Sequence, residues 1–354
     1  MKTIIYGVGE LCQKLLSLEF EKTSASEIMI IDSFVSGEVN GLAVNAPRAL
    51  PDNCEINKVV VCSFNHFEEI YRFLIQMGVS EGKIYVPDIN LNLISMDELL
   101  RIRRTGIIVC TLPKSGTVWI NKCLHEMTRR NVANDRNYLY NAKFTDESFF
   151  SPDILDSMCR SGGINVGHFM CNEYNSTVLE HFLKNGLKLV IHLRDPRQAL
   201  ISWLHHLDKR VHGKPLLMQL LGLNESYFSK SFEEKIKHLI DTQFVEMCKW
   251  VASWKKFSEK VSEDCFLMLP HEQLSLDAEE YSSCFAKYLD VPESMLGLAM
   301  KPKDGQAHFR KGVTDEWQQV LSLADKDKME KIMKEYQIFD FLQHMCEKQK
   351  FVSI

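Results

Sequence analysis

Thr111-Leu-Pro-Lys-Ser-Gly-Thr117 is the stretch of sequence that decides the fold of the larger part of this chain. It follows the apolar run Ile107 to Cys110 and precedes the segment Val118 to Met127, a pattern typical of a buried strand, a turn and a helix. A strand that leads through a polar glycine turn into a helix commonly holds a phosphate group, because backbone N–H groups at the helix start point at the anion. We therefore predict a phosphate site here.

The side chains of this turn fit the same chemistry. Lys114 supplies a mobile cation, Ser115 and Thr117 supply hydroxyl donors, and Gly116 lets the backbone approach a ligand closely. A Walker A loop has a glycine five residues before Gly-Lys-Ser/Thr, whereas here the lysine precedes Ser-Gly-Thr. The order of residues therefore argues against an NTPase.

Two later segments carry further candidates for binding phosphate. The apolar run Leu187 to Leu193 predicts a buried strand, in which His192 is expected to be buried, and Arg194 follows the strand with Ser202 eight residues further on. Arginine suits a phosphate because its planar fork donates two parallel hydrogen bonds. The alternative for Arg194 is a strand-end salt bridge with Asp195.

The order Pro113-Lys114-Ser115-Gly116-Thr117-x-Trp119 resembles the 5′-phosphosulfate loop of PAPS-dependent sulfotransferases. Arg194 with Ser202 is similar to the 3′-phosphate site of that family, and Phe309-Arg310-Lys311-Gly312 resembles its Arg-Lys-Gly clamp. The resemblance covers residues 104 to 350 or so. It implies that PAPS is the donor and PAP the product. The cofactor-binding residues that it implies are Pro113, Lys114, Ser115, Gly116, Thr117, Val118, Trp119, Arg194, Ser202, Phe309, Arg310, Lys311 and Gly312.

His168 is the candidate base. An acceptor hydroxyl must lose its proton, and a histidine titrates near neutral pH. His168 ends an expected strand, Ile164 to Gly167, and the base of the family that this chain resembles lies at a strand end similarly upstream of the 3′-phosphate arginine. The resemblance also implies that Lys114 stabilises the leaving oxygen. The alternative for His168 is a packed or capping residue.

Three residues depart from the pattern of that family. Val118 replaces a threonine that many members use on the phosphate, and Val166 stands where a lysine often lies two residues before the base. His271 stands where a tyrosine is usual, after the strand-like segment Cys265 to Pro270. We expect one fewer hydroxyl contact and one fewer charge near the transferred group.

The first hundred residues predict a separate parallel sheet. Apolar runs at 2–6, 28–31, 58–62 and 83–86 alternate with helical patterns at 10–18 and 67–77. Gly7 and Gly9 match the start of a dinucleotide-binding turn, but Cys12 replaces its third glycine, and Asp32 follows the second strand. This part loosely resembles the Rossmann-like modules of bacterial sugar-modifying enzymes. It either binds a nucleotide or sugar nucleotide, or serves as a scaffold, which we favour.

The expected fold is therefore α/β with two domains. Residues 1–89 form a Rossmann-like domain, residues 90–104 a linker helix, and residues 105–354 a P-loop-like sulfotransferase domain whose central parallel sheet is flanked by helices. We expect the acceptor pocket to be built by residues 131–160 and 211–232. These segments carry Tyr138, Tyr140, Phe144, Phe149, Phe150, Tyr227 and Phe228.

Composition narrows the classes of partner. The chain has 354 residues and a net charge of −5, so no global basic field predicts a nucleic-acid partner. Eleven cysteines without a C-x-x-C pair, a start unlike a secretory signal and no long apolar stretch predict a cytoplasmic chain without a membrane span. We expect no metal site, and the sequence leaves homo-oligomers open.

These expectations favour a sulfotransferase that acts on an acceptor hydroxyl. The Leu193-Arg-Asp-Pro-Arg197 string resembles carbohydrate sulfotransferases, whereas the Arg-Lys-Gly clamp resembles the cytosolic small-molecule branch, and a sugar-containing acceptor is slightly favoured. Two alternatives remain open. One is a nucleotide-dependent enzyme that acts through the first hundred residues, and the other is a PAP-binding scaffold without turnover.

Overall fold

The computed structural model describes residues 1–20, 24–88, 90–129, 149–297 and 314–348. Contacts divide the chain into two compact units. Unit 1 comprises residues 1–104, 123–136 and 291–297, and unit 2 comprises residues 105–122, 137–290 and 298–354. Each unit contains its own sheet.

Within the described residues, the sheet of unit 1 has seven strands in the order β3-β4-β2-β1-β5-β6-β7. Pairing is parallel from β4 to β6, and antiparallel at both edges. The strands are β1 (Lys2–Tyr6), β2 (Ile28–Ile31), β3 (Gly37–Val39), β4 (Leu42–Asn45), β5 (Ile56–Val61), β6 (Ile84–Pro87) and β7 (Leu93–Ser95). The helices are α1 (Glu10–Phe20), α2 (Phe67–Gln76) and α3 (Met96–Arg103). The central strands are apolar because a parallel sheet is covered on both faces.

The expected linker helix over residues 90–104 is wrong in its first half. Leu93–Ser95 forms the edge strand β7, which pairs with β6, and the helix begins only at Met96. The Ser95 hydroxyl accepts a hydrogen bond from the Glu98 N–H and so fixes that helix start. Because contacts assign the chain up to Arg104 to unit 1, α3 is part of that unit rather than a separate linker.

The described sheet of unit 2 has four strands, all parallel, in the order β11-β10-β8-β9. The strands are β8 (Gly106–Thr111), β9 (Gly163–Gly167), β10 (Lys188–Leu193) and β11 (Phe266–Pro270). Helix α4 (Thr117–Thr128) begins in this unit, and its residues from Cys123 on belong to unit 1. The other helices are α5 (Pro152–Ser161), α6 (Glu173–Leu183), α7 (Pro196–His206), α8 (Pro215–Leu220), α9 (Glu225–Phe228), α10 (Phe232–Leu239), α11 (Val245–Ser258), α12 (His271–Leu276), α13 (Ala278–Leu289), α14 (Glu316–Val320), α15 (Leu323–Glu335) and α16 (Phe339–Lys348).

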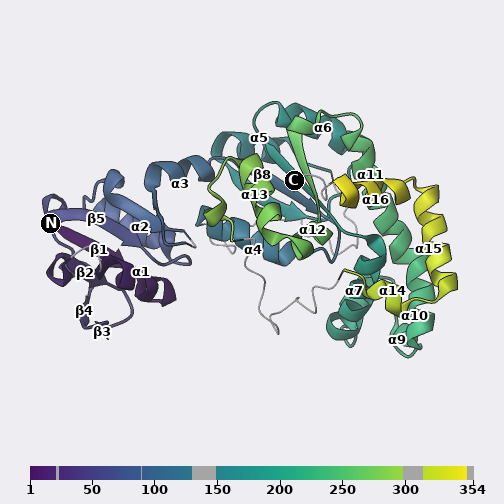
Figure 1. The fold of residues 1–354 in the computed structure, drawn as a ribbon, viewed down its shortest axis with the longest axis horizontal. Helices are drawn as coiled ribbons and strands as arrows, with labels where there is room; N and C mark the ends of the chain where they lie inside the picture. The colour runs from purple at the N-terminus through teal and green to yellow at the C-terminus, as the bar shows by residue number, and fades with distance from the viewer. Residues whose placement is uncertain (21–23, 89, 130–148, 298–313, 349–354) are drawn as a thin grey trace. The chain divides into compact units, whose positions relative to one another are not determined.

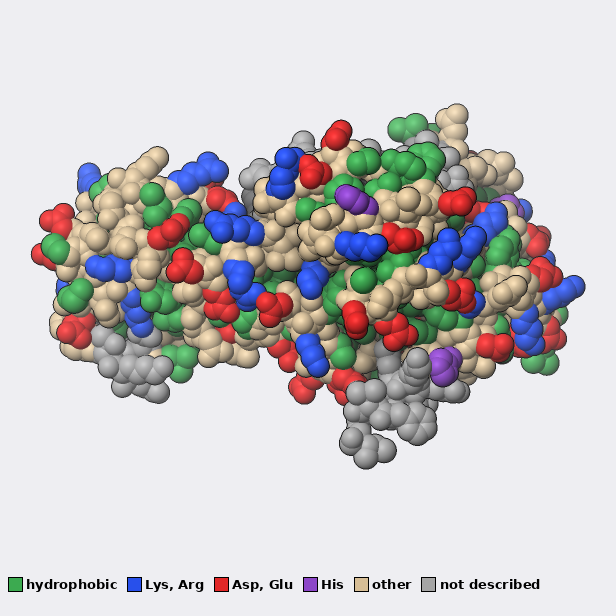
Figure 2. All heavy atoms as spheres, turned by 90° about the horizontal axis from the view of Figure 1, so that it is seen from above, with side chains coloured by type: hydrophobic (Ala, Val, Ile, Leu, Met, Phe, Trp, Pro, Cys, Tyr) green, Lys and Arg blue, Asp and Glu red, His purple; other side chains and the backbone are tan. Residues whose placement is uncertain are grey.

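Helices of unit 2 pack around this sheet, and a large hydrophobic cluster joins residues of β8 and β10 to residues of α7 and α11. Helix α15 contacts both α11 and α16, so the last described helices cover the helix that carries the buried Trp250 and Trp254 (Figure 1). On the face of the molecule in Figure 2, acidic and basic side chains are interspersed. None of the described helices is long and apolar enough to cross a membrane.

Candidate functional site

Three neighbouring strands of unit 2 bring the predicted site residues to one edge of the sheet. β8 lies between β9 and β10, with Cys110 opposite Gly167 and Thr111 opposite His192. The chain leaves β8 toward the loop at residues 112–116, β9 toward His168 and β10 toward Arg194. Because the strands are parallel, all three connections emerge at the same carboxyl edge. In open α/β sheets, ligands bind at this edge, where the strand order reverses.

The loop after β8 turns its backbone sharply before α4. Lys114 has φ +71° and Gly116 has φ +94°, both in the left-handed region. A Cβ on Gly116 would meet His271 at an ordinary 3.8 Å, so glycine is needed here for its backbone conformation rather than for space. The Trp119 and Ile120 N–H groups donate to the Gly116 carbonyl, so the N–H groups of Thr117 and Val118 are the ones at the helix start that no preceding helical turn pairs. These are the groups expected to bind an anion.

Two side chains at the end of β10 bind the carbonyl oxygens of this loop. Arg194, only 6% exposed, donates from Nη1 to the Lys114 carbonyl, and His192 Nε2 lies 2.6 Å from the Ser115 carbonyl oxygen. The Ser115 N–H, in the peptide that carries the Lys114 carbonyl, donates to the Leu112 carbonyl at 3.2 Å. The Gly116 N–H, in the peptide that carries the Ser115 carbonyl, is therefore the one that these contacts orient toward the opposite side. The loop is therefore preorganised for an anion before any ligand arrives.

His192 is fully buried, as expected from the sequence, and its protonation state follows from its partners. A carbonyl can only accept, so Nε2 carries the proton and donates to Ser115, while the Tyr281 hydroxyl donates to Nδ1 at 2.8 Å. Burial lowers the pKa of His192 to about 4, and the Arg194 charge adds to this shift. The His271 ring lies edge-on at 5.7 Å, and burial lowers its pKa well below the ordinary value too. Both rings are neutral at neutral pH.

His168 reaches the same loop from β9. Its Nδ1 lies 2.9 Å from the Thr111 carbonyl oxygen and 3.2 Å from Thr111 Oγ1. Thr111 Oγ1 also lies 2.7 Å from Thr117 Oγ1, at the first residue of α4. Because the carbonyl requires a donor, the neutral ring carries its proton on Nδ1 and its lone pair on Nε2. Hydrogen bonds thus connect the histidine directly to Thr111 and, through the Thr111 hydroxyl, to Thr117 at the other end of the loop.

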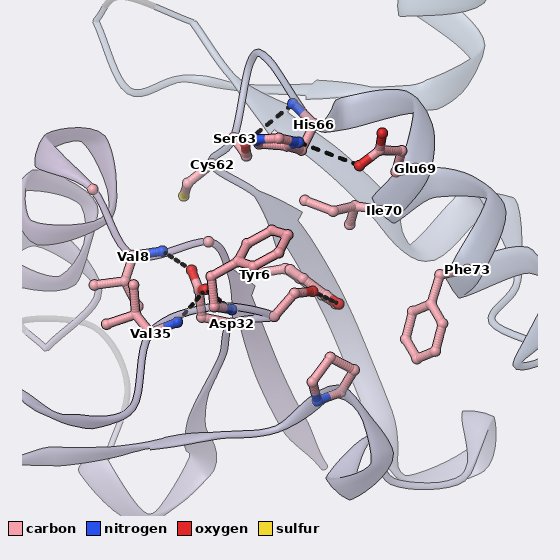
Figure 3. A pocket seen from close by; sticks show the side chains of 15 residues that line it. Tyr6, Val8, Asp32, Val35, Cys62, Ser63, His66, Glu69, Ile70 and Phe73 are labelled. Atoms are coloured by element: carbon pink, nitrogen blue, oxygen red, sulfur yellow. Dashed lines mark hydrogen bonds and ion pairs between the residues drawn. The ribbon is translucent and has the colours of Figure 1, made fainter.

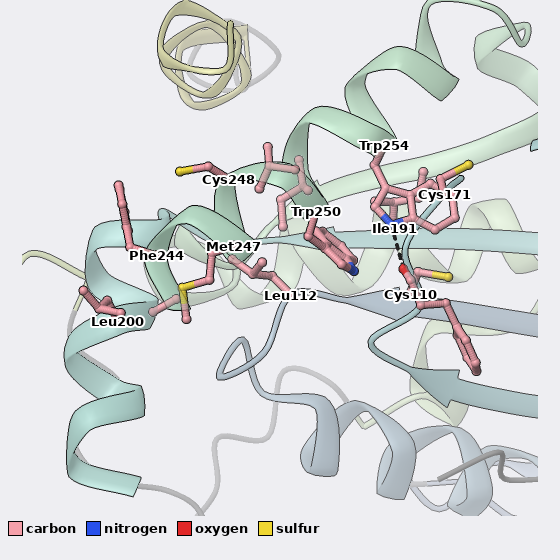
Figure 4. Packing of buried hydrophobic residues seen from close by; sticks show 14 of the residues in the cluster. Cys110, Leu112, Cys171, Ile191, Leu200, Phe244, Met247, Cys248, Trp250 and Trp254 are labelled. Atoms are coloured by element: carbon pink, nitrogen blue, oxygen red, sulfur yellow. Dashed lines mark hydrogen bonds between the residues drawn. The ribbon is translucent and has the colours of Figure 1, made fainter. Parts of the chain in front are cut away.

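The backbone around His168 is fixed from behind by α11. Trp250 and Trp254 are fully buried, and their indole N–H groups donate to the carbonyls of His168 and Phe169, each at 3.0 Å. Figure 4 shows both tryptophans among the core residues, near Cys110, Leu112 and Ile191. A rigid core therefore positions the candidate base.

The start of α7 holds an ion pair beside Arg194. Asp195 caps α7 by accepting from the Arg197 N–H, and its carboxylate pairs with the Arg197 guanidinium at 2.6 Å. The Arg197 guanidinium also lies over the Trp317 ring, 3.8 Å from its centroid. The Asp195 N–H donates to Glu272. Asp195 therefore has its own arginine partner in Arg197, and Arg194 contacts the loop.

Of the remaining predicted donor residues, Pro113, Val118 and Trp119 lie in or beside this loop. Pro113 is buried, Trp119 is partly buried and Val118 is 55% exposed at the helix start. Ser202 lies on α7 and is partly buried. The fourth predicted segment, residues 309–312 (Phe309, Arg310, Lys311 and Gly312), lies outside the described residues.

Ser115 differs from the expectation that its hydroxyl faces a phosphate. The side chain is fully buried, and the hydroxyl donates to the Leu112 carbonyl at 2.6 Å. The Ser115 N–H bonds to the same carbonyl. The Ser115 hydroxyl is thus used in a hydrogen bond within the turn, between the left-handed residues Lys114 and Gly116. Ser115 therefore stabilises the loop rather than facing a phosphate.

The expected acceptor-pocket aromatics are not all available to a ligand. Tyr227 and Phe228 are buried in the hydrophobic core, as is Phe150, whereas Phe149 is 63% exposed. Tyr138, Tyr140 and Phe144 lie outside the described residues. The aromatic content of these segments therefore reflects core packing as much as a pocket.

The network around His192 and Tyr281 was missed by sequence reasoning. The two residues are 89 positions apart, and neither belongs to a recognisable motif. The only signal was a histidine inside an otherwise apolar strand, which requires a partner for each ring nitrogen. Within the described ranges, no group of three or more His, Cys, Asp or Glu side chains has the arrangement of a metal site.

Comparison with known proteins places this chain among similar sequences and structures. A model of the sulfotransferase domain family matches residues 104–348. Cytosolic sulfotransferase 5 of Arabidopsis thaliana is 22% identical over 285 residues, which cover 72% of this chain and 86% of the relative. Cytosolic sulfotransferase 6 of the same plant is 21% identical over 294 residues, with coverage of 72% and 85%. The crystal structure of mouse sulfotransferase SULT7A1 complexed with PAP covers 72% of this chain and 96% of its own, with 13% identity and a TM-score of 0.46.

Proposed function

The chain belongs to the sulfotransferase domain family, and from this premise we propose that it transfers the sulfuryl group of PAPS (3′-phosphoadenosine 5′-phosphosulfate) to an acceptor hydroxyl. The observation that carries the proposal is the meeting of three groups at adjacent strand ends: Lys114 after β8, His168 after β9 and Arg194 after β10. Each has the chemistry that one part of this reaction needs.

The loop after β8 fits the 5′ end of the donor. Its Lys114 and Ser115 carbonyls are bound by Arg194 and His192, which leaves the Gly116 N–H and the start of α4 for an anion. Lys114 adds a positive charge in the same turn. PAPS supplies the sulfuryl group, and Arg194 with Ser202 would hold its 3′-phosphate. Lys114 would stabilise the negative charge that develops on the leaving oxygen.

His168 would accept the proton of the acceptor hydroxyl. Its Nδ1–H is bonded to the Thr111 carbonyl, so the lone pair lies on Nε2, on the other side of the ring. General-base catalysis of this kind contributes about 10²- to 10⁴-fold to a rate. The hydrogen bond from His168 Nδ1 to the Thr111 carbonyl and the one from the Trp250 indole to the His168 carbonyl limit how the ring and its backbone move, which supports this role.

We propose a sugar-containing acceptor as the first candidate, with a small phenol or alcohol as the second. The string Leu193 to Arg197 supports the first, because it resembles carbohydrate sulfotransferases. The second is supported by the similarity to two plant proteins named cytosolic sulfotransferases. Transfer of labelled sulfate from PAPS to a panel of oligosaccharides, phenols and alcohols separates them. Labelling of phenols alone would overturn the sugar assignment and leave the reaction itself intact.

We also propose that unit 1 is a Rossmann-like module. The parallel order β4-β2-β1-β5-β6 and the glycine turn between β1 and α1 support this assignment. An enzyme that worked through this unit would use its turn at Gly7 and its acid at Asp32. Measuring the affinity for PAP and for NAD on the same sample tests that alternative. NAD binding without PAP binding would overturn the sulfotransferase proposal.

A further inference from the structure

Unit 1 contains a cavity of about 650 Å³ at the carboxyl ends of β1, β2 and β5. β2 lies on one side of β1 and β5 on the other, so the cavity opens where the strand order reverses. This is the place where open α/β sheets bind ligands. Its volume lies within the range of about 300 to 1,000 Å³ that small-molecule sites occupy.

Aromatic rings line part of this pocket, and Tyr6 and Phe73 are among the side chains that Figure 3 labels. Phe34 is 80% exposed, and its ring lies 5.7 Å from the His66 ring. Tyr6 and Phe73 make an edge-to-face pair further along the wall, with centroids 6.2 Å apart. A large apolar ring that is left in water beside a cavity gives a flat ligand ring a surface on which to stack.

Asp32 supplies a fixed acceptor inside the pocket. One carboxylate oxygen accepts from the N–H groups of Phe34 and Val35 at 2.7 and 2.9 Å, and the other accepts from the Val8 N–H at 2.7 Å. An ionised carboxylate has about four acceptor positions, so about one remains on the oxygen that Val8 binds. Burial raises the pKa of Asp32, but these three donors outweigh it and keep the pKa below its ordinary value. The carboxylate is therefore ionised and held in place, with about one acceptor position left for a hydroxyl donor.

The charges of the pocket disfavour a ligand with several phosphates. Its lining includes the acids Asp32 and Glu69, and none of the described lining residues is Lys or Arg. His66 lies 3.2 Å from the Glu69 carboxylate. A diphosphate in this pocket would therefore face the carboxylates of Asp32 and Glu69. The imidazole of His66, which could otherwise bind a phosphate, already contacts Glu69.

The glycines of the turn between β1 and α1 also have an explanation that does not require a dinucleotide. Gly7 has φ +102°, and a Cβ there would meet Ser63 at 3.3 Å, so the fold itself requires this glycine. A Cβ on Gly9 would meet nothing within 4 Å. The half-matched dinucleotide motif thus has a structural explanation in Gly7, and Gly9 leaves open space on the pocket side.

We propose that this pocket binds an uncharged ring joined to neighbouring hydroxyls, such as a ribonucleoside or an aryl glycoside. The ring stacks on Phe34, and a hydroxyl donates to the remaining acceptor position of Asp32. This assigns unit 1 a ligand site of its own and replaces the scaffold interpretation that the sequence favoured.

Titration calorimetry on the full-length chain tests the proposal, with uridine, adenosine, phenyl β-glucoside, ADP and NAD as probes. Saturating PAP is present throughout, so that adenosine has no access to the loop after β8. We expect one of the three uncharged probes to bind, the Phe34→Ala variant to weaken it at least tenfold, and the Met77→Ala variant to leave it unchanged. Met77 is a matched control because it is an apolar side chain of the same unit, 48% exposed and outside the pocket lining.

Three results overturn the proposal. The first is no heat from any uncharged probe at millimolar concentration. The second is equal affinity in wild type and in Phe34→Ala. The third is tighter binding of ADP or NAD than of the uncharged probes, which would show that the pocket recognises phosphates. In a second variant, Gly9→Ala, the added methyl group meets no protein atom within 4 Å, so the fold should tolerate it. Because Gly9 lines the pocket, the methyl group should also weaken ligand binding.

Discussion

Acid should destabilise unit 2 through His192. The pKa of this buried histidine is about 4 in the folded chain against an ordinary value of 6.5, so the unfolded chain binds the extra proton first. The contribution of the neutral His192 to the free energy of unfolding is then fully present above pH 6.5 and is lost as the pH falls toward 4. The full shift of this pKa corresponds to about 3 kcal/mol of unfolding free energy. Between pH 7.5 and pH 4.5, about 2.5 kcal/mol of that free energy is lost.

Neighbouring groups also titrate in this range. His271 adds a loss of the same sign, because burial lowers its pKa well below the ordinary value. Glu272 acts in the opposite direction, because burial and then the Asp195 charge raise its pKa. The Arg194 guanidinium stays charged throughout. A comparison of wild type with His192→Gln separates His192 from these groups, since they are present in both proteins.

Tryptophan fluorescence during urea unfolding reports on this unit. The five tryptophans of the chain are Trp119, Trp203, Trp250, Trp254 and Trp317, and all lie in unit 2. We expect wild type to lose about 2.5 kcal/mol more than His192→Gln between pH 7.5 and pH 4.5. Parallel pH profiles for the two proteins would refute the assignment of a neutral, buried His192.

The same reasoning predicts a defect for Tyr281→Phe at neutral pH. This variant removes the donor to His192 Nδ1 but keeps the ring, and a buried acceptor without its donor costs about 1 to 3 kcal/mol. An unfolding free energy at pH 7.5 equal to that of wild type would contradict the hydrogen bond and the tautomer derived from it.

Three further variants test the transfer site. Lys114→Ala should weaken PAP binding about 10- to 100-fold in calorimetry, because a charged hydrogen bond is worth about 1.5 to 3 kcal/mol, whereas Lys256→Ala on the exposed face of α11 should not. His168→Ala should keep its affinity for PAP and lose turnover by about 10²-fold or more. The control His181→Ala, at an exposed histidine, should keep both, and unchanged turnover in His168→Ala would remove His168 from the mechanism. Trp250→Phe removes the indole that holds the His168 carbonyl and should cost about 1 to 3 kcal/mol of stability, measured by urea unfolding; no loss would show that this contact is weak.

Much of the site could be predicted because it lies on the most regular part of the chain. β8 and β10 are runs of buried apolar residues, and each ends in a polar segment with its own motif. Parallel strands then place Lys114, His168 and Arg194 at one edge without further information. Sequence patterns sufficed here because each residue's position follows from the strand that precedes it.

The short edge strands and the side-chain network of the candidate site depend on contacts that the local sequence does not indicate. The hairpin of β3 and β4 and the edge strand β7 are short and only partly buried, and no apolar run in them is longer than three residues. The hydroxyl of Ser115 is used inside its own turn, and the partner of His192 comes from α13. Aromatic content placed Tyr227 in an acceptor pocket, whereas packing buries it in the core.

The central claim is that the groups at the ends of β8, β9 and β10 form one sulfuryl-transfer site. The most direct measurement is the transfer of radiolabelled sulfate from PAPS by wild type and by the Lys114→Ala and His168→Ala variants, with PAP formation followed in parallel. We expect label on a hydroxyl-bearing acceptor with wild type, and a loss of at least about 10²-fold with His168→Ala. Tight PAP binding without transfer to any member of the acceptor panel would contradict the claim and indicate a PAP-binding scaffold instead.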